Sequence, residues 1–230
     1  IILLLIYKFS YLTYVWLPSL VLILYLYFEK KNFTFIKSKG AEYFDSFETT
    51  EKWKVINGEP RIDSNNGQPP PSLVLQMASR ENNKFHAGMN TFLLFEPLGE
   101  FRNGIIDCDI LITSGLVNVV FRGDIQNNFV ESSWYMARFD TRGTDSDISF
   151  LIKLPKESWR HIARSGKTAP VNVWIKMRIE IINNHFKLFL NNDPNPLAEI
   201  KDNTLGSGKI GLFNELGEIF VDNFRIIEGK

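Results

Sequence analysis

Residues 173–190 read Val-Trp-Ile-Lys-Met-Arg-Ile-Glu-Ile-Ile-Asn-Asn-His-Phe-Lys-Leu-Phe-Leu and carry the clearest structural pattern in the chain. Apolar and polar side chains alternate along 174–181, which is typical of a β-strand with one buried face. Asn183-Asn184 predicts a tight turn, because asparagine tolerates the positive φ angles that two-residue hairpin turns require. Residues 185–190 then form the returning strand. The core face of the first strand should carry Ile175, Met177, Ile179 and Ile181.

The same kind of pattern extends from this hairpin toward both ends of the domain. Short apolar runs alternate with clusters of Asn, Asp, Gly and Pro, as in all-β sandwiches. No helical periodicity longer than about two turns competes with them. We therefore expect an all-β domain over 41–230, a two-sheet antiparallel jelly-roll sandwich. The expected strands are 43–47, 53–56, 73–78, 91–95, 104–112, 117–122, 134–140, 148–154, 159–163, 173–182, 185–190, 209–213 and 218–227.

The first 28 residues differ in character, because they are almost entirely apolar and aromatic. Residues 11–28 approach the roughly 20 apolar residues that a helix needs to cross a bilayer. Tyr14 and Trp16 suit an interfacial belt, and Pro18 predicts a kink. We expect a transmembrane helix with its flank over 1–31 and a juxtamembrane linker over 32–40. The alternatives are a cleavable signal peptide, disfavoured because no small-residue cleavage site follows, and an earlier span that ends within 1–7.

Charge and cysteine content exclude several classes of protein. The chain has 26 basic and 26 acidic residues, and the part after residue 40 is mildly acidic. No basic stripe is present for phosphate contacts, so we expect no nucleic-acid partner. Cys108 is the only cysteine. An intrachain disulfide and a cysteine-based zinc cluster are therefore excluded.

The C-terminal half resembles the concanavalin A-like lectin/glucanase superfamily, in its laminin-G-like or 3-keto-disaccharide-hydrolase-like branch. Four motifs carry the resemblance: Val-Trp-Ile-Lys-Met-Arg-Ile at 173–179, Phe-Lys-Leu-Phe-Leu-Asn at 186–191, Gly-Lys-Ile-Gly-Leu-Phe at 208–213 and Phe-Val-Asp-Asn-Phe-Arg-Ile at 220–226. Upstream, 47–53 resembles the usual opening of the domain, and 120–122 with 134–138 resembles a hairpin of the family. The resemblance covers about 41–228 and implies a sandwich fold. It leaves function open, because lectins, glycosidases and assembly modules share this fold.

The sequence contains partial matches to catalytic and cofactor-binding motifs, but the surrounding residues do not support them. Residues 206–211 match the dinucleotide pattern GxGxxG, but they lead into a strand rather than a helix. The E-x-D-x-E string of related glycosidases is absent, and the Asp107/Asp109 pair is best explained as an exposed strand edge. His86, His161 and His185 are scattered along the chain. We expect no catalytic residues, no cofactor and no metal, with 124–128 as the place to test for calcium.

One polar face remains as a candidate ligand site. Trp134, Arg138 and Asp140 share one side of their expected strand, and Asn118 and Arg122 share one side of its expected partner. Sugar sites combine an aromatic platform with planar hydrogen-bonding groups. The alternative is a solvated outer face on which arginine stems cover the sheet.

Two functions follow from these observations. The first is a non-catalytic, membrane-anchored interaction module, an accessory or assembly subunit that contacts the bilayer and other membrane subunits through Tyr14, Trp16 and Pro18. The alternative is a carbohydrate-binding or carbohydrate-hydrolysing surface protein with a glycan on the polar face. The lysines of 30–39 favour a cytoplasmic domain, whereas the resemblance implies an exported one. We expect a single-pass membrane protein with an extracytoplasmic domain.

Overall fold

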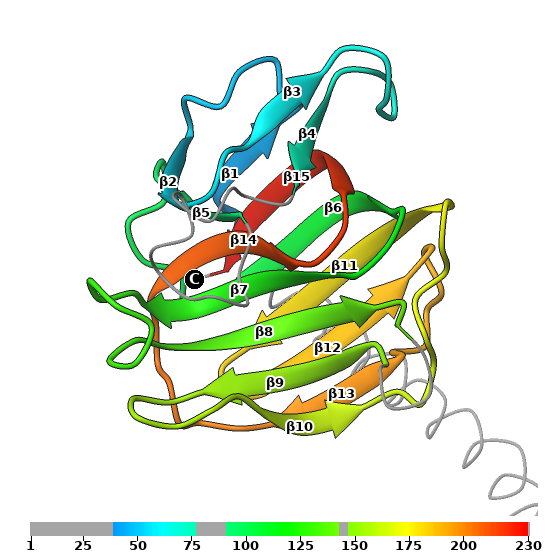
Figure 1. Ribbon diagram of the computed structural model, residues 1–230. Helices are drawn as coiled ribbons and strands as arrows, with labels where there is room; N and C mark the ends of the chain where they lie inside the picture. Colours follow the sequence, from blue (N-terminus) through cyan, green and yellow to red (C-terminus); the bar gives the residue numbers. More distant parts are fainter. Residues whose placement is uncertain (1–38, 77–90, 143–146, 230) are drawn as a thin grey trace, which may run out of the picture. The chain divides into compact units, whose positions relative to one another are not determined.

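The computed structural model describes residues 39–76, 91–142 and 147–229, which form two antiparallel sheets packed face to face (Figure 1). The first sheet has eight strands in the order β13-β12-β11-β6-β15-β4-β3, with β1 paired to β15. The second has seven strands in the order β10-β9-β8-β7-β14-β5-β2. This confirms the expected two-sheet antiparallel sandwich. The strands are β1 (Lys39–Asp45), β2 (Trp53–Asn57), β3 (Arg61–Asp63), β4 (Ser72–Leu75), β5 (Phe92–Phe95), β6 (Gly104–Ile112), β7 (Leu116–Asp124), β8 (Ser133–Asp140), β9 (Ser149–Lys153), β10 (Arg160–Arg164), β11 (Trp174–Ile182), β12 (His185–Leu190), β13 (Ala198–Lys201), β14 (Lys209–Glu215) and β15 (Ile219–Gly229).

The predicted hairpin forms as β11 and β12, in register from Ile182 opposite His185. Asn183 has a positive φ of 55°, as the turn requires. The four predicted core residues of β11 are at most 1% exposed. Two short strands, β3 and β13, were not predicted, because three or four residues are too few to show a periodic pattern.

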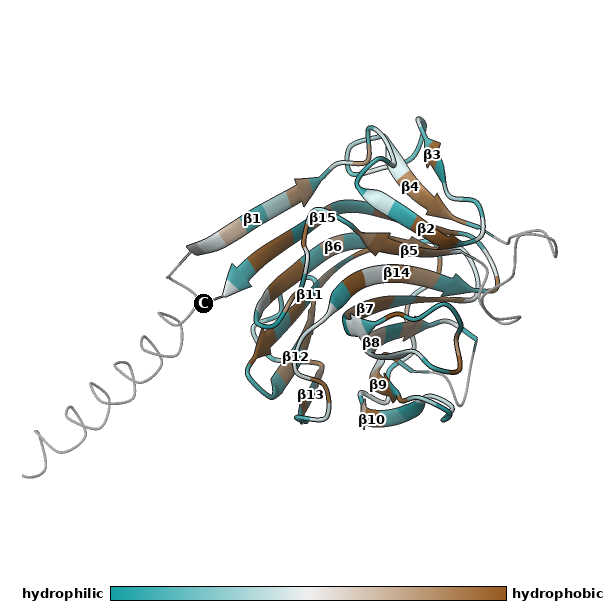
Figure 2. Cartoon of the chain, turned by 90° about the vertical axis from the view of Figure 1, so that its left-hand side faces the viewer, coloured by the Kyte–Doolittle hydropathy of each residue, from teal (hydrophilic) through white to brown (hydrophobic). Residues whose placement is uncertain are grey.

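The core lies between the sheets, and Figure 2 shows hydrophobic residues along strands of both. Phe186 of β12 illustrates how the sheets interlock. Its ring lies 5.3 Å from that of Phe121 and 4.8 Å from that of Tyr135, and both of these belong to the second sheet. Edge-on aromatic pairs at this spacing add to the free energy gained from burial. All three rings are fully buried.

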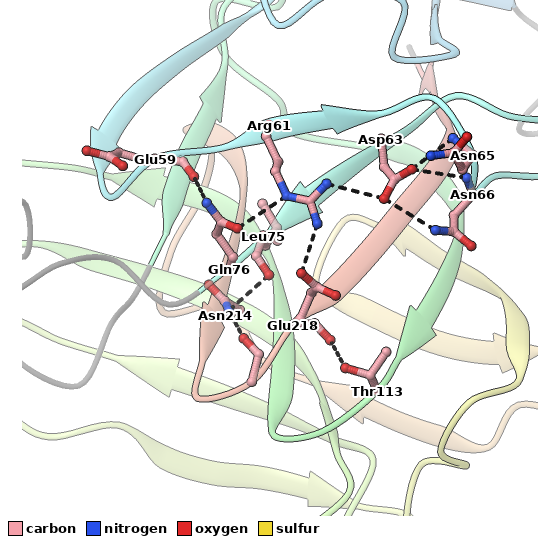
Figure 3. A network of polar contacts seen from close by, with 11 residues as sticks. Glu59, Arg61, Asp63, Asn65, Asn66, Leu75, Gln76, Thr113, Asn214 and Glu218 are labelled. Atoms are coloured by element: carbon pink, nitrogen blue, oxygen red, sulfur yellow. Dashed lines mark hydrogen bonds and ion pairs between the residues drawn. The ribbon is translucent and has the colours of Figure 1, made fainter.

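A second link between the sheets lies beside the turn between β14 and β15, and Figure 3 shows it. Buried Asn214 of the second sheet donates to the carbonyl of Leu75 in the first and accepts a hydrogen bond from the Thr91 backbone. Arg61 lies in the same network but is more exposed, and it bonds Asp63 and Glu218 through its guanidinium. Asn214 therefore ties the two sheets together from within, whereas Arg61 joins segments of the first sheet at the surface.

The N-terminal predictions fall largely outside the described part. Residues 1–38 contain the predicted membrane helix and most of the predicted linker, and with them Tyr14, Trp16 and Pro18. Over the described ranges, no helix has the length and apolarity needed to cross a membrane. β1 begins at Lys39, earlier than expected, and Gly40 allows this pairing because a Cβ there would lie 2.5 Å from the carbonyl oxygen of Glu228. The membrane helix stays a prediction.

Replacing Asn214 should be far more damaging than replacing Arg61. Asn214→Ala leaves buried backbone groups of both sheets without partners, so we expect the free energy of unfolding to fall by about 2–4 kcal/mol. Arg61→Ala removes only exposed ion pairs and should cost less than about 1 kcal/mol. Denaturant unfolding of the two variants beside the wild type measures both values. Equal losses would show that Asn214 is not a special link.

Candidate functional site

The outer face of the second sheet, which points away from the core, carries four of the five predicted ligand residues, Arg122 being the exception. Phe213, Asn118, Arg138 and Ser149 are register partners in turn across β14, β7, β8 and β9. They form one row across this face. Apolar residues lie on one side of the row and polar residues on the other, so the face has an apolar half and a polar half.

The apolar half is a second hydrophobic core. Its buried members are Phe92, Leu94, Val120, Trp134, Met136, Leu151 and Phe213. Ile125 and Phe129, from the connection between β7 and β8, pack on them together with Trp159. Trp134 is 0% exposed, with the Phe129 ring 5.7 Å away. The prediction that Trp134 provides an exposed sugar platform is therefore wrong, because the connection that directly precedes β8 folds back and covers it.

Lys153 of β9 holds this covering loop in place. It is fully buried, and its ammonium group donates to the carbonyls of Val130, Ser132 and Leu154. The same group lies 4.8 Å from the centre of the Phe129 ring, a favourable cation–π distance. Burial lowers the pKa of Lys153 below its usual value. The edge of the loop is therefore held by a buried ammonium group rather than by an apolar side chain.

The polar half holds a group of side chains that we call the polar cluster. At its centre, Arg138 donates through Nε to Asn118 Oδ1 at 3.1 Å and through Nη2 to Glu215 Oε1 at 3.1 Å. Beside it, Arg142 binds Asp140 with two nitrogens, at 3.0 and 2.8 Å. The polar cluster comprises Asn118, Arg138, Asp140, Arg142, Asp147, Ser149, His161 and Glu215.

Burial and pairing set the electrostatics of the polar cluster. Burial lowers the pKa of Arg138, and it raises the pKa of Glu215 although Arg138 opposes this. Burial also acts to raise the pKa of Asp140, but hydrogen bonds from Arg142 outweigh it and the pKa is lowered. The two carboxyl groups lie on β8 and β14, and both strands place them opposite Leu116 of β7. One face therefore carries two carboxyl groups whose pKa values move in opposite directions.

Two buried polar atoms of the polar cluster have no hydrogen-bond partner among the described residues. They are Nδ2 of Asn118 and Oδ1 of Asp147. The amide of Asn118 is oriented by Arg138, which bonds its oxygen, so the free atom is a donor. The other oxygen of Asp147 accepts from the Gly166 backbone, so the free atom is an acceptor. Buried polar groups nearly always find partners, so each such atom needs an explanation, and a bound ligand is one.

His161, Ser149 and Asp147 lie together but do not form a catalytic triad. Nδ1 of His161 lies 3.1 Å from Ser149 Oγ and 4.0 Å from Asp147 Oδ1. A triad needs the serine and the carboxylate on opposite ring nitrogens. Burial lowers the pKa of His161, and the nearby Arg164 lowers it further. The ring contributes polarity to the site, not an activated nucleophile.

Arg122 does not belong to this face. Between Phe121 and Asp124, β7 takes one more step than β8, so a β-bulge reverses the direction of the side chain. Arg122 has a positive φ of 50° and lies over the ring of Phe186 at 5.1 Å. It is 3% exposed, and its guanidinium donates to backbone carbonyls of Arg102, Asn183 and Leu205. The alternation that predicted its direction fails at the bulge, and Arg122 is a structural residue.

The structure places the predicted site residues differently, and their role in binding a ligand stays a prediction. The structure brings Asn118, Arg138 and Asp140 together in the polar cluster. Sequence reasoning missed Glu215, although alternation continued through β14 would have placed it on the outer face with Phe213. Sequence reasoning also missed Trp159 as a site residue. Trp159 lies in the connection between β9 and β10, where side-chain directions do not alternate regularly.

The remaining sequence candidates have other roles. Asp107 accepts two hydrogen bonds from Arg178, at 2.7 and 3.1 Å, and Asp109 accepts one from Asn223 at 2.8 Å, on the first sheet. Both carboxylates are capped by these donors, but the expected strand edge is wrong, because β6 lies between β11 and β15 and Asp107 is 6% exposed. Within the ranges that the structure describes, no group of three or more His, Cys, Asp and Glu residues could hold a metal ion. Asp124, in the segment named as the place to test for calcium, accepts a hydrogen bond from Gln126 at 2.6 Å.

Replacing Lys153 tests its role under the loop. Lys153→Met keeps the length of the apolar stem but removes all three donors, so we expect the free energy of unfolding to fall by about 2–3 kcal/mol. The exposed Lys167→Met should change it by less than about 0.5 kcal/mol. Because the folded pKa of Lys153 lies below the unfolded value, the unfolded chain binds more protons, and this group adds stability as pH rises toward 10.5. The gap between wild type and Lys153→Met in denaturant unfolding should widen accordingly, and a gap independent of pH would contradict this.

Comparisons with known proteins identify the fold. No protein-family model matches the chain, and no curated protein matches it. Among solved structures, it is similar to the carbohydrate-binding module CBM66 from Bacillus subtilis, with a TM-score of 0.56 and 17% identity over 76% of this chain and 94% of that one. A protein of unknown function with a galectin-like fold, also from Bacillus subtilis, gives a TM-score of 0.58 and 14% identity over 83% of this chain and 97% of that one.

A β-glucanase from Bacillus licheniformis gives a TM-score of 0.51 and 13% identity over 83% of this chain and 99% of that one. At these identities the matches establish the fold alone. They agree with the expected two-sheet sandwich; the expected superfamily and its laminin-G-like or 3-keto-disaccharide-hydrolase-like branch stay predictions. The described domain has the two-sheet sandwich fold that these solved structures share.

Proposed function

We propose that this chain is a carbohydrate-binding module and that its sugar site is the polar cluster. The observation that carries the proposal is the pair of unpartnered buried atoms, the donor Nδ2 of Asn118 and the acceptor Oδ1 of Asp147. A sugar hydroxyl both donates and accepts hydrogen bonds. One ligand with neighbouring hydroxyls therefore matches both atoms, whereas a purely apolar ligand matches neither.

The surroundings of these atoms support the proposal. Arg138 and Asn118 provide planar hydrogen-bonding groups held in place by Glu215 and by each other. Trp159 is partly exposed at the boundary with the apolar half, and the Arg138 guanidinium lies 5.2 Å from its ring centre. Flat aromatic surface beside a few fixed polar groups is the usual composition of a small-ligand site. The carbohydrate-binding module among the fold neighbours is consistent with this assignment.

Hydrolysis is the second candidate, and one observation favours it. The pKa of Glu215 is raised and that of Asp140 is lowered on the same face, and such divergent pairs provide an acid and a base in enzymes. Against it, Glu215 is bonded to Arg138 and Asp140 to Arg142, so neither carboxylate is free to attack. The centre of the face, where Val120 and Met136 pair, is apolar. We therefore propose binding without cleavage.

The membrane-anchored assembly subunit was the first hypothesis from the sequence. It depends on residues 1–31, which lie outside the described part, and the described residues favour the carbohydrate-binding alternative. Attachment of the module to a membrane, with an extracytoplasmic domain, stays a prediction for the N-terminal segment.

Substituting Asn118 tests the proposed site, and circular dichroism checks that the variant folds, because its new carboxylate lies in a buried cluster. Asn118→Asp keeps the oxygen that Arg138 bonds and replaces the unpartnered donor by an acceptor. We expect it to bind at least about tenfold more weakly to any sugar that the wild-type chain binds on a glycan array. Glu180→Gln, a change of similar size on the outer face of the first sheet, is the matched control and should bind as the wild type does.

Two outcomes would contradict the proposal. If the wild-type chain bound no glycan on the array, the module would have another function. If Asn118→Asp and Glu180→Gln bound equally well, the sugar site would lie elsewhere. Release of reducing sugar from the bound glycan, measured in the same samples, would replace binding by hydrolysis as the function.

A further inference from the structure

The carboxylates of the polar cluster are buried together with Arg138, whereas Arg142 and His161 are partly exposed. The side chains of Asp140, Asp147 and Glu215 are 2%, 8% and 10% exposed. In contrast, the side chain of Arg142 is 38% exposed and that of His161 is 28% exposed. A ligand that approaches this half of the face therefore meets cationic and donor groups first.

Arg164 adds a further cation to this rim. It is register partner to Ser149, so it lies in the same row as Arg138, and its charge acts on His161 together with the burial of that ring. Arg164 is exposed, and its guanidinium makes no hydrogen bond or ion pair with any residue in the described ranges. It is therefore available to a ligand.

The arginines of the polar cluster also have guanidinium nitrogens that bind no described residue. Arg138 uses Nε and Nη2 for its partners, and Arg142 uses the same two nitrogens for Asp140, so neither Nη1 is paired with a described residue. Both oxygens of Asp140 already accept hydrogen bonds from Arg142. Two acceptor atoms also remain: Asp147 Oδ1 faces His161, and Glu215 Oε2 accepts no hydrogen bond from a described residue.

The exposed layer of the site is cationic, although the charges of the site balance overall. Arg138, Arg142 and Arg164 stand against Asp140, Asp147 and Glu215, and the lowered pKa of His161 favours its neutral ring. Arg142 has a carboxylate partner, as Arg61, Arg178 and Arg225 on the first sheet have theirs. The exposed cations of the site are therefore Arg142 and Arg164.

We propose that the site binds an anionic sugar, one whose carboxylate or sulfate lies against Arg142 and Arg164 while its hydroxyls reach Asn118 and Asp147. This inference rests on the proposed carbohydrate-binding function. Guanidinium groups bind carboxylates and sulfates through charge-assisted, often bidentate hydrogen bonds that a neutral hydroxyl cannot match. The anion adds charge attraction, and the hydroxyls make the site one for a sugar rather than for a simple anion.

The test compares three oligosaccharides of equal length on the full chain: a galacturonate trimer, a sulfated galactose trimer and a neutral galactose trimer. We expect at least one acidic trimer to bind about tenfold or more tightly than the neutral one at low ionic strength. This preference should shrink as salt is added, because salt screens exposed charges. Which acidic trimer binds identifies the anionic group as carboxylate or sulfate.

Arg164→Gln should remove most of the preference and leave the folded chain intact, since its guanidinium has no partner in the described part to lose. Arg225→Gln, which removes an exposed arginine that binds Glu42 on the first sheet, is the control and should leave the preference unchanged.

Equal binding of all three trimers, unaffected by Arg164→Gln, would overturn the anionic preference and leave the carbohydrate site in place. An equal effect of Arg225→Gln and Arg164→Gln would also overturn it, because the attraction would then be general. If no sugar bound, here or on the glycan array, the proposed function itself would fail.

Discussion

Burying charge on the face of a β-sheet is unfavourable unless every charge is paired, and this constraint shapes the second sheet. The same strands bury apolar rings in one half of their outer face and the Arg138–Glu215 pair in the other. A buried ion pair is often no more stable than apolar side chains of similar size. Folding alone therefore gives little reason for a charged half where an apolar layer already fits. Binding of a ligand to the charged half would give such a reason.

The pairing also explains how the site is held. Arg138 is bonded on one side by Asn118 from β7 and on another by Glu215 from β14, so three neighbouring strands fix its guanidinium. Lys153 fixes the loop over the apolar half, and its carbonyl partners leave the ammonium no freedom to reach a ligand. The scaffold is thus rigid on the apolar side and offers polar groups on the other. Preorganised groups of this kind lose little entropy when they bind.

The sequence predicts those parts of the molecule that depend on local patterns. Alternation identified the β11–β12 hairpin and its core face, because side-chain direction repeats every two residues along an unbroken strand. Arg122 shows where this fails, since a single bulge reverses the direction and no local signal marks it. Trp134 shows a second limit, because its strand face was correct but its cover comes from the loop that carries Phe129. Alternation placed Asn118 and Arg138 correctly, but their pairing with Glu215 joins strands far apart in sequence and required the structure.

The central claim is that a sugar occupies the polar cluster, and a structure of the chain with its tightest-binding glycan tests it most directly. The account predicts a sugar ring on the outer face of the second sheet, with hydroxyl groups within hydrogen-bond distance of Asn118 Nδ2 and Asp147 Oδ1, the two atoms of the polar cluster that are buried without a partner among the described residues. A glycan bound instead to the outer face of the first sheet, beside Arg178 and Asp107, would contradict it.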